Sequence, residues 1–497
     1  MPPFCRTADM PPHHLFLRVN RNMKQRSIEM TEGPLFKNIV LFSLPLVLSN
    51  VLQVLFNMSD VAVVGRFAGK EALGSVGSCS TLVLLFTGLL IGMGSGINSL
   101  AARHIGAGDT VRLRRVVHSA LLISVIYGIL ISAVGISAAR PLLRLLGTKE
   151  ELLAGAELYT RVYLLGAPAL AIYNYGNGIL GAAGDSRRPL LYLSLSGALN
   201  IGLNLFFVIV CRWGVLGVAV ASVSSQYLSA LLVLIRIFTC HENYRASVRE
   251  LRFDSAASAS VLTLGVPAGL QNSIFAVANL FIQSAVNSFD TVMVEGNSAA
   301  ANSDALVYDM MAAFYMACTA FMAQNFGAKK RDRVLKSYGI SIGLAFCFAL
   351  AFGFFLFFGG RQFLALFTND DAVIDAGMKR LSIMAFSYCI SAFMDGTIAA
   401  SRGLGKTVVP TIVVISGSCL FRILWIYTVF AHFRTIPSLY LLYIFSWTLT
   451  AIGEIIYFLH VLRKVLPKEE APATSPDEAL LPPDAAPAAC NAGEEGK

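Results

Sequence analysis

The sequence predicts an all-α membrane protein with twelve transmembrane helices, arranged in two six-helix lobes related by pseudo-symmetry. Three observations predict this class: the composition, the recurrence of long apolar windows and an internal repeat. Of the 497 residues, 56% are hydrophobic and only 14% are charged, whereas soluble proteins carry about 25% charged residues. The composition therefore argues against a soluble enzyme and favours a chain that crosses a bilayer many times.

Twelve apolar windows, separated by charged or Gly/Pro-rich breaks, follow one another between residues 36 and 460. Each window has roughly 20 residues, the length that crosses a bilayer as a helix. The windows are centred near residues 48, 90, 126, 169, 199, 226, 273, 314, 347, 389, 419 and 450. We therefore expect one lobe over residues 33–238, a linker over 239–257 and a second lobe over 258–465.

The two ends of the chain differ from these windows in composition. Residues 1–32 contain no continuous apolar core of the signal-peptide type, so we expect neither cleavage nor packed structure there. Residues 466–497 are rich in Ala, Pro and Glu and cannot bury a core. We expect this tail to be disordered.

The distribution of lysine and arginine predicts the orientation in the membrane. Loops on the side of the two termini hold 27 of the 39 Lys and Arg residues, the opposite loops hold 10, and two lie inside spans. Because Lys and Arg are enriched in cytoplasmic loops, we expect both termini to be cytoplasmic. The formal charge of +9 then reflects orientation and contact with anionic membrane lipid, and we expect no nucleic-acid partner.

The sequence carries no pattern of catalytic or metal-ligating residues. The nine cysteines form no Cys-x-x-Cys pair and no Cys/His cluster at ligand spacing, and the seven histidines lie mostly in loops or at span ends. A membrane-embedded enzyme would need paired catalytic groups inside a span, and direct use of ATP would need a P-loop motif. We expect no structural metal, no cofactor and no enzymatic activity.

An internal repeat relates the two halves of the chain. Five residues of the first half recur in the second at an offset of 221 or 222: Pro45, Asn50, Asn57, Gly184 and Pro189 match Pro267, Asn272, Asn279, Gly405 and Pro410. Six spans per half is an even number, so both halves have the same orientation and are related by an axis along the membrane normal. Duplicated bundles of this kind usually enclose a substrate path, which predicts a transporter.

Several segments resemble the multidrug and toxic compound extrusion (MATE) family, specifically its bacterial branch. The matching segments are residues 44–66, 102–109, 180–186, 300–302 and 401–407. Their order and twofold recurrence cover roughly residues 33–462. The resemblance implies two six-helix lobes around a V-shaped, outward-open cavity, and export driven by inward movement of H⁺ or Na⁺. We accordingly expect a monomeric antiporter of the bacterial cytoplasmic membrane that exports amphipathic, cationic organic compounds.

Asp60 is the first candidate for coupling. It is followed by four apolar residues, and a charge at membrane depth is costly enough to indicate function. The matching Asp of the family's first span has the coupling role. Pro45, fifteen residues earlier, would let this span bend, and the repeat places Ile282 where a second Asp60 would lie, which makes the site asymmetric. The alternative is an interfacial Asp that caps the helix.

Asparagine residues surround this carboxylate in the expected first lobe. Asn200 and Asn204 are four residues apart and share one helical face, and Asn174 and Asn177 lie in the preceding span. The family's archaeal-type, proton-coupled members have an Asp at the position of Asn204, so a two-carboxylate relay is not expected here. Neutral oxygens around one carboxylate suit Na⁺ as well as H⁺. The alternative role is gluing helices together.

Polar and aromatic residues of both halves are candidates for lining the substrate cavity. They are Asn57, Gln226, Gln271, Asn272, Phe275, Tyr315, Asp395 and Arg422. Aromatic rings would suit flat hydrophobic cations through cation–π contact. For Arg422 we also consider a structural ion pair with Asp395 or Glu454, and snorkelling to the lipid interface.

A lipid-linked precursor flippase of the same superfamily is the alternative function. Such a carrier should hold a cluster of Arg and Lys in its central cavity, and often has fourteen spans. Only Arg422 lies deep in a span, and we count twelve spans. These observations favour the antiporter.

Overall fold

The computed structural model describes residues 27–466. Residues 1–26 and most of the tail that we expect to be disordered, residues 467–497, lie outside the described residues. The first half consists of α2 (Leu35–Phe67), α3 (Lys70–Gly106), α4 (Thr110–Leu145), α5 (Glu150–Leu164), α6 (Ala167–Ala182), α7 (Arg187–Leu205) and α8 (Gly214–Thr239). The second consists of α9 (Ser255–Val286), α10 (Thr291–Gly327), α11 (Arg331–Leu364), α12 (Asp371–Gly403), α13 (Val408–Val414), α14 (Phe421–Trp425), α15 (Ala431–Phe433) and α16 (Ile436–Val465).

Eleven helical segments of the described chain are long and apolar enough to cross a membrane. The remaining expected span, centred near residue 169, consists of α5 and α6, which are separated at Leu165 and Gly166. Pro168 lies in the first turn of α6, where its missing N–H costs no helical hydrogen bond. The prediction of an all-α membrane protein is confirmed, and all twelve expected spans are found once the broken pair is counted as one.

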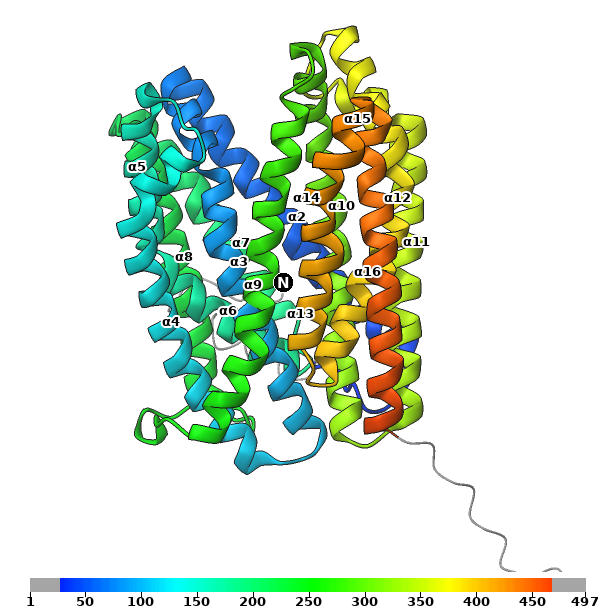
Figure 1. Cartoon of the computed structure of the whole chain (residues 1–497). Helices are drawn as coiled ribbons and strands as arrows, with labels where there is room; N and C mark the ends of the chain where they lie inside the picture. The colour runs from blue at the N-terminus through cyan, green and yellow to red at the C-terminus, as the bar shows by residue number, and fades with distance from the viewer. Residues whose placement is uncertain (1–26, 467–497) are drawn as a thin grey trace, which may run out of the picture.

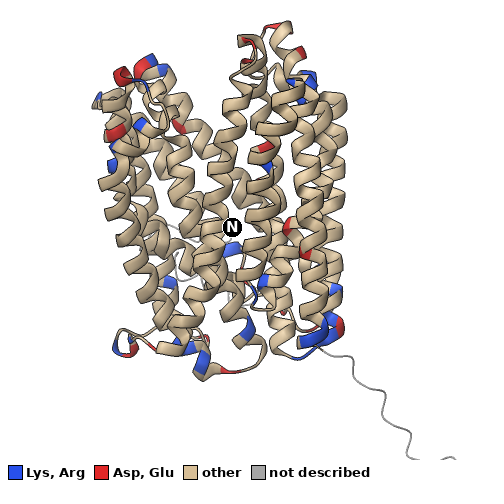
Figure 2. Cartoon of the chain, viewed as in Figure 1, with Lys and Arg blue, Asp and Glu red and all other residues tan. Residues whose placement is uncertain are grey.

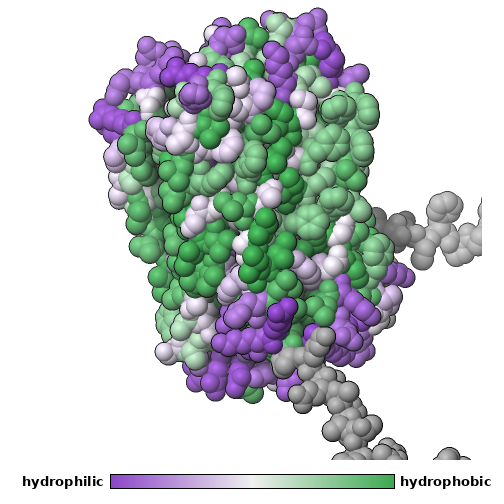
Figure 3. All heavy atoms as spheres, turned by 45° about the vertical axis from the view of Figure 1, so that its right-hand side comes forward, coloured by the Kyte–Doolittle hydropathy of each residue, from purple (hydrophilic) through white to green (hydrophobic). Residues whose placement is uncertain are grey.

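The two halves diverge toward one end and meet toward the other (Figure 1). We call the end with the α3–α4 turn, the α10–α11 turn and the end of α16 the basal end, and the opposite end the apical end. Charged residues concentrate at the two ends, with few between them (Figure 2). The face shown in Figure 3 has a hydrophobic belt between polar ends. This distribution is the one that a bilayer imposes on a spanning protein.

Equivalent features occur in the two halves at the spacing of the internal repeat. Pro45 lies inside α2 and Pro267 inside α9. A π-helical turn over Phe206–Val210 follows α7, and another over Ile426–Phe430 follows α14. Such turns widen a helix locally and are frequent at functional sites. These two π-helical turns are 220 residues apart, close to the offset of the repeat. The second half has a further π-helical segment over Ile415–Leu420, where α7 of the first half is regular α-helix.

Small residues let the two halves cross closely along α3 and α9. A Cβ atom on Gly92 would lie 2.1 Å from the backbone nitrogen of Gly269, and one on Gly96 would lie 2.5 Å from that of Gly265. Gly92 and Gly96 are four residues apart on α3, and Gly265 and Gly269 are four residues apart on α9, so the two glycines of each helix lie on one helical face. This Gly-x-x-x-Gly geometry is the usual way for membrane helices to approach at backbone distance.

Polar residues mark where several helices begin. The side chains of Asp109, Asp254, Asp290 and Asp370 each accept a hydrogen bond of 2.9 Å from a backbone N–H in the first turn of the following helix. Such caps satisfy N–H groups that have no partner within the helix. These four acids therefore stabilise helix starts near the ends of the bundle.

The N-terminal segment is packed where the structure describes it, and the prediction of residues 1–32 as unpacked is wrong at residues 28–32. Met30 is 1% exposed and belongs to an apolar cluster with Ile39, Phe42 and Phe321. The carbonyl of Met30 accepts a hydrogen bond from Asn325 at 3.1 Å. This packing could not be predicted, because the segment carries no apolar periodicity and its hydrogen bonds to Asn325 and Arg333 join residues about 300 positions apart along the chain.

Candidate functional site

Asp60 lies in the apical half of α2 and makes hydrogen bonds to two other helices. Its Oδ1 accepts a hydrogen bond from the side-chain amide of Asn204 on α7. Its Oδ2 accepts one from the hydroxyl of Ser222 on α8 at 3.2 Å. Asn204 also donates to Oδ1 of Asn200 at 3.2 Å. We call these four residues the Asp60 cluster; it joins α2, α7 and α8.

The Asp60 cluster offers one carboxylate and several neutral oxygens. The side-chain oxygen of Asn204 is buried and has no hydrogen-bond partner in the described residues. Asn204 is 0% exposed and Asn200 is 5% exposed. Carboxylate, amide and hydroxyl oxygens are the ligands that hard cations prefer, and Asp60 is the member that can also take up a proton. The cluster can therefore exchange a cation, which changes the hydrogen bonds that join the three helices.

A close approach between α2 and α7 brings Asp60 to its partners. Gly197 has no side chain, and a Cβ there would lie 1.9 Å from the ring of Phe56. Phe56 stands one turn before Asp60 on α2, and Gly197 stands one turn before Asn200 on α7. The ring of Phe56 thus lies on the backbone of α7 and sets the distance across which Asp60 reaches Asn204.

The other predicted cation ligands are not joined to this cluster by any hydrogen bond of the described chain. The side chain of Asn174 donates to the carbonyl of Leu170, one turn earlier on α6, at 2.9 Å. The side-chain oxygen of Asn177 is buried and has no hydrogen-bond partner in the part of the chain that the structure describes. Of the five predicted coupling residues, the structure therefore brings together Asp60, Asn200 and Asn204, and it adds Ser222.

The candidate cavity residues of the first half and of α9 occupy different environments. Asn57 is exposed, while the side-chain oxygens of Gln226 and Gln271 are buried without partners among the described residues. Asn272 on α9 donates to the carbonyl of Gly88 on α3 at 3.3 Å. Asn272 thus joins the two halves, whereas Gln226 and Gln271 have hydrogen-bonding capacity left over.

Arg422 is surrounded by aromatic rings. Its guanidinium carbon lies 4.7 Å from the ring centre of Tyr443, 5.7 Å from Phe275 and 5.8 Å from Trp447. Its Nε donates to Ser446 at 3.2 Å, and the residue is 2% exposed. Aromatic faces stabilise a cation electrostatically. Cation–π contacts therefore replace the carboxylate partner that we considered for this arginine.

The other two acids considered with Arg422 stand apart from it. Within residues 27–466, neither Asp395 nor Glu454 forms an ion pair with Arg422. Asp395 accepts a hydrogen bond from Ser391 at 3.0 Å. Both side-chain oxygens of Glu454 are buried and find no hydrogen-bond partner among residues 27–466. Tyr315, the remaining cavity candidate, also has a buried hydroxyl with no partner in the described part of the chain.

The sequence analysis missed a polar network in the apical half of the second lobe. Arg380 on α12 forms an ion pair with Asp304 on α10, which also accepts a hydrogen bond from Tyr388. Oδ1 of Asn297 accepts hydrogen bonds from Arg380 and Tyr440, each at 2.7 Å. Arg380 lies within α12, which begins at Asp371. The four-residue spacing of Arg380 to Met384 and Tyr388 on one helical face was the available signal.

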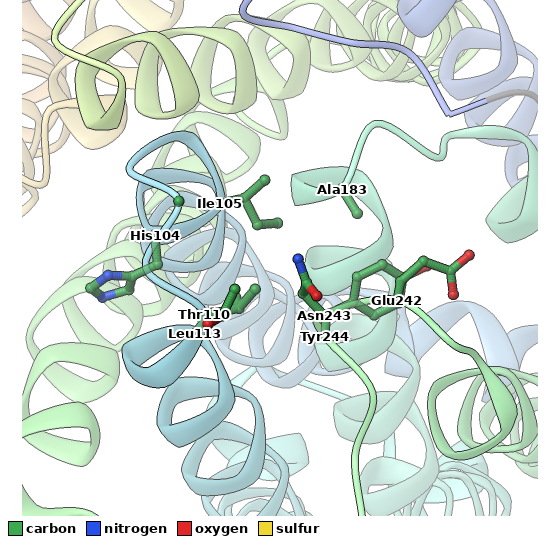
Figure 4. A pocket seen from close by; sticks show the side chains of 9 residues that line it. His104, Ile105, Thr110, Leu113, Ala183, Glu242, Asn243 and Tyr244 are labelled. Atoms are coloured by element: carbon green, nitrogen blue, oxygen red, sulfur yellow. The ribbon is translucent and has the colours of Figure 1, made fainter.

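A small pocket at the basal end is lined by residues of the α3–α4 turn and of the segment after α8; Figure 4 shows this lining from close by. Its volume is about 190 Å³, and its lining includes His104, Thr110, Glu242 and Tyr244. Sites for drug-sized molecules usually measure about 300–1,000 Å³, so this pocket is too small for such a ligand. Burial alone would raise the pKa of Glu242, but the charge and the 2.7 Å hydrogen bond of Arg236 outweigh burial and hold this pKa below its ordinary value.

Comparison with known sequences identifies the same repeat. The MatE family model matches residues 45–206 and again residues 267–428. The second match is displaced from the first by 222 residues at both ends, which confirms the internal repeat. Together the two matches cover more than half of the chain.

Relatives of known name extend the match over most of the chain. A probable multidrug resistance protein of Bacillus subtilis, YpnP, is 26% identical over 78% of this chain and 87% of its own length. A probable multidrug resistance protein of Thermotoga maritima, NorM, is 25% identical over 76% of this chain and 82% of its own. An FAD transporter of Shewanella oneidensis is 24% identical over 70% of this chain and 77% of its own.

Solved structures agree with the fold. The outward-facing conformation of a multidrug resistance MATE family transporter of the MOP superfamily superposes with a TM-score of 0.82 at 25% identity, over 88% of this chain and 98% of the other. A MATE protein in complex with MaD3S superposes with a TM-score of 0.81 at 25% identity, over 88% and 99% of the two chains. With two copies of the family's repeat along one chain and this bundle of spanning helices, the protein belongs to the MatE family, the multidrug and toxic compound extrusion transporters.

Proposed function

We propose that this transporter is a secondary antiporter that exports amphipathic, cationic organic compounds across the bacterial cytoplasmic membrane in exchange for H⁺ or Na⁺. Membership in the MatE family and the names of its multidrug resistance relatives support export of drugs and toxins. No cofactor is required, because one elementary charge moving down about 100 mV supplies about 2.3 kcal/mol. We propose that the chain works as a monomer in contact with membrane lipid.

The observation that carries this proposal is the Asp60 cluster. A single carboxylate within the bundle holds three helices together through hydrogen bonds to Asn204 and Ser222. Uptake of H⁺ or Na⁺ changes what Asp60 can accept, and so changes the position of α2 relative to α7 and α8. A cation-dependent helix contact of this kind is what an antiporter needs to tie ion movement to a change of access.

The orientation of the bundle follows from its charges. The basal end carries the loops in which most Lys and Arg residues lie, and cytoplasmic loops are enriched in these residues. We therefore propose that the basal end and both termini face the cytoplasm, and that the diverging apical ends face outward.

Uptake of dye into inverted membrane vesicles tests this function; the cytoplasmic face of such vesicles is their outer face, so this uptake is the direction of efflux from the cell. A fluorescent cationic dye is followed with an imposed pH gradient and, separately, with an imposed Na⁺ gradient. We expect Asp60→Asn to lose gradient-driven efflux, because an amide cannot take up a proton and carries no charge to bind a cation, while Asp375→Asn, at an exposed apical carboxylate, retains it. Efflux by the parent protein that ignores both gradients would contradict antiport, and unchanged efflux by Asp60→Asn would contradict the site.

The same assay distinguishes the class of substrate. One relative is named an FAD transporter, so a fluorescent flavin dinucleotide is measured beside the cationic dye. The proposal predicts gradient-driven movement of the cation and none of the flavin. Gradient-driven movement of the flavin alone would contradict the cationic substrate class while leaving the coupling site in place.

A further inference from the structure

The described N-terminal segment bridges the two lobes at the basal end. We call residues 28–33 the strap. On the side of the first lobe, the backbone N–H of Ile28 donates to the carbonyl of Gly184, in the turn between α6 and α7, at 3.1 Å. Gly184 has a φ of +81°, and a Cβ there would lie 2.3 Å from the carbonyl oxygen of Ile28. The turn is therefore shaped for close approach of this backbone.

Side chains of the second lobe bind the rest of the strap. Arg333 at the start of α11 donates to three strap carbonyls: Met30 at 3.1 Å, Glu32 at 3.0 Å and Gly33 at 3.0 Å. Lys330 donates to the carbonyl of Thr31 at 2.9 Å. A charged donor makes each of these hydrogen bonds stronger than a neutral one.

A buried asparagine orients the arginine. Asn325 is 0% exposed; its Oδ1 accepts from Nε of Arg333 at 3.2 Å, and its Nδ2 donates to the carbonyl of Met30 at 3.1 Å. The side chain of Met30 fills the apolar space between α2 and α10. The strap is thus held by polar contacts on one face and by an apolar plug on the other.

The strap lies where the lobes already touch. Gln324 on α10 donates to the carbonyl of Ala182 on α6 at 2.6 Å. A Cβ on Gly106 would lie 1.9 Å from the carbonyl oxygen of Gln324, and one on Gly327 would lie 2.0 Å from that of Arg103. The basal ends of α3 and α10 therefore cross at backbone distance, and separation of the lobes at this end would have to break the bridge that the strap adds.

We propose that the strap is a latch that holds the basal end closed, and that its release accompanies basal opening. The second lobe holds it through Arg333, Lys330 and Asn325. In the first lobe, Asn38 on α2 itself donates to the carbonyls of Glu29 and Glu32 at 2.9 and 3.1 Å; beyond α2, the hydrogen bond that joins the strap to the described first lobe is Ile28–Gly184. Release therefore occurs at Gly184, and the strap stays with α10 and α11. Because the strap runs directly into α2, which begins at Leu35, its release separates the base of the helix that carries Asp60 from the α6–α7 turn. This inference rests on alternating access, as the proposed function does.

Two substitutions break the latch at opposite ends. Arg333→Gln removes the guanidinium that binds three strap carbonyls. Ile28→Pro removes the N–H that donates to Gly184, at a position outside every helix, so that folding of the bundle is not at risk. Arg331→Gln is the matched control, because it removes the same charge from the same helical turn. Arg331 donates to the carbonyl of Leu466 and makes no hydrogen bond to the strap in the described chain.

Distances between spin labels measure the outcome in lipid nanodiscs, with the native cysteines replaced. A basal pair is placed at Val111 and Lys406, and an apical pair at Thr148 and Asn369. We expect both latch variants to raise the population with a long basal distance by about fivefold or more, since the loss of one ordinary hydrogen bond already shifts an equilibrium about fivefold. Arg331→Gln should match the parent protein.

The two label pairs separate the latch from the proposed function. A basal distance distribution that neither latch variant changes would overturn the latch. A longer basal distance with an unchanged apical distance would support the latch and contradict alternating access. A longer basal distance with a shorter apical distance supports both.

Discussion

At the scale of residues, the position of Asp60 explains how one charge can act on three helices. Each carboxylate oxygen has one partner, Asn204 on α7 for Oδ1 and Ser222 on α8 for Oδ2. Both partners are neutral, so the charge of the site changes only when Asp60 gains or loses a cation. The two asparagines on α7 act as one unit, because Asn204 donates to both Asp60 and Asn200.

Glu242, in the linker between the lobes, gives a prediction about pH. Burial raises the pKa of Glu242, but the charge and hydrogen bond of Arg236 outweigh burial and hold this pKa below the ordinary value of a glutamate. A carboxyl with a lowered folded-state pKa adds stability that is complete above its unfolded pKa and is lost as the pH falls through the folded one. We expect Glu242→Gln to lower the thermal unfolding temperature at pH 7 and to match the parent protein near pH 3.

The measurement is thermal unfolding in detergent between pH 3 and pH 7. Glu250→Gln is the control on the same linker, because the side chain of Glu250 is 50% exposed and exposed pairs contribute little. An equal deficit of Glu242→Gln at every pH would show that the pair with Arg236 has no part in the pH dependence.

At the scale of elements, the approach of α2 to α7 decides whether Asp60 reaches its partners. The approach depends on Gly197, because a residue without a side chain leaves room for the ring of Phe56. The π-helical turn over Phe206–Val210 begins two residues after Asn204. The same helix therefore supplies a contact surface, two polar ligands and a local distortion within about four turns.

A methyl group on Gly197 should separate these two helices. Gly197→Ala places a Cβ against the ring of Phe56, and overpacking of this kind costs about 1–3 kcal/mol. We expect a lower unfolding temperature and a loss of gradient-driven efflux. Gly202→Ala on the same helix is the control, since nothing lies within 4 Å of a Cβ there. Equal efflux by the two variants would show that the approach of α2 to α7 is not needed for coupling.

Helical periodicity predicted part of this site and could not predict the rest. Asn200 and Asn204 are four residues apart, so their common face follows from helix geometry alone. The choice of Ser222 over Gln226 on α8 depends on how that helix is rotated about its axis, which its packing partners decide. Likewise, the ion pair of Asp304 and Arg380 depends on where α10 and α12 begin. Apolar windows in the sequence do not locate these helix starts, because the helices extend past the windows into turns that contain charged residues.

At the scale of the whole molecule, the internal duplication accounts for the two lobes, and the two lobes differ at the position of Asp60. The two matches to the family model, displaced by 222 residues, give two lobes with the same chain direction. Composition and the internal repeat sufficed to predict them. Polar groups are costly in a bilayer, so spanning segments appear in the sequence as long apolar windows. The lobes differ where function is expected: Asp60 has Ile282 as its counterpart, and Ile282 is packed in an apolar core.

The strap adds a second asymmetry at the basal end. It precedes α2 and crosses from Gly184 to Arg333, whereas the segment before α9 is the linker that contacts α4 through His118, Ser119 and Arg115. The first helix of each lobe is therefore anchored differently: α2 on the opposite lobe, and α9 on the lobe that precedes it. The cation that we propose to bind at Asp60 would therefore act on the helix whose base contacts both lobes.

Substrate-induced ion flux in proteoliposomes tests the central role of Asp60 most directly. Purified protein is reconstituted, a cationic substrate is added on one side, and movement of H⁺ and of Na⁺ is recorded with no imposed gradient. The parent protein should move one of these ions in the direction opposite to the substrate, and Asp60→Asn should move neither above the level of empty liposomes. Opposite ion flux through Asp60→Asn at the rate of the parent protein would contradict the assignment of coupling to this carboxylate.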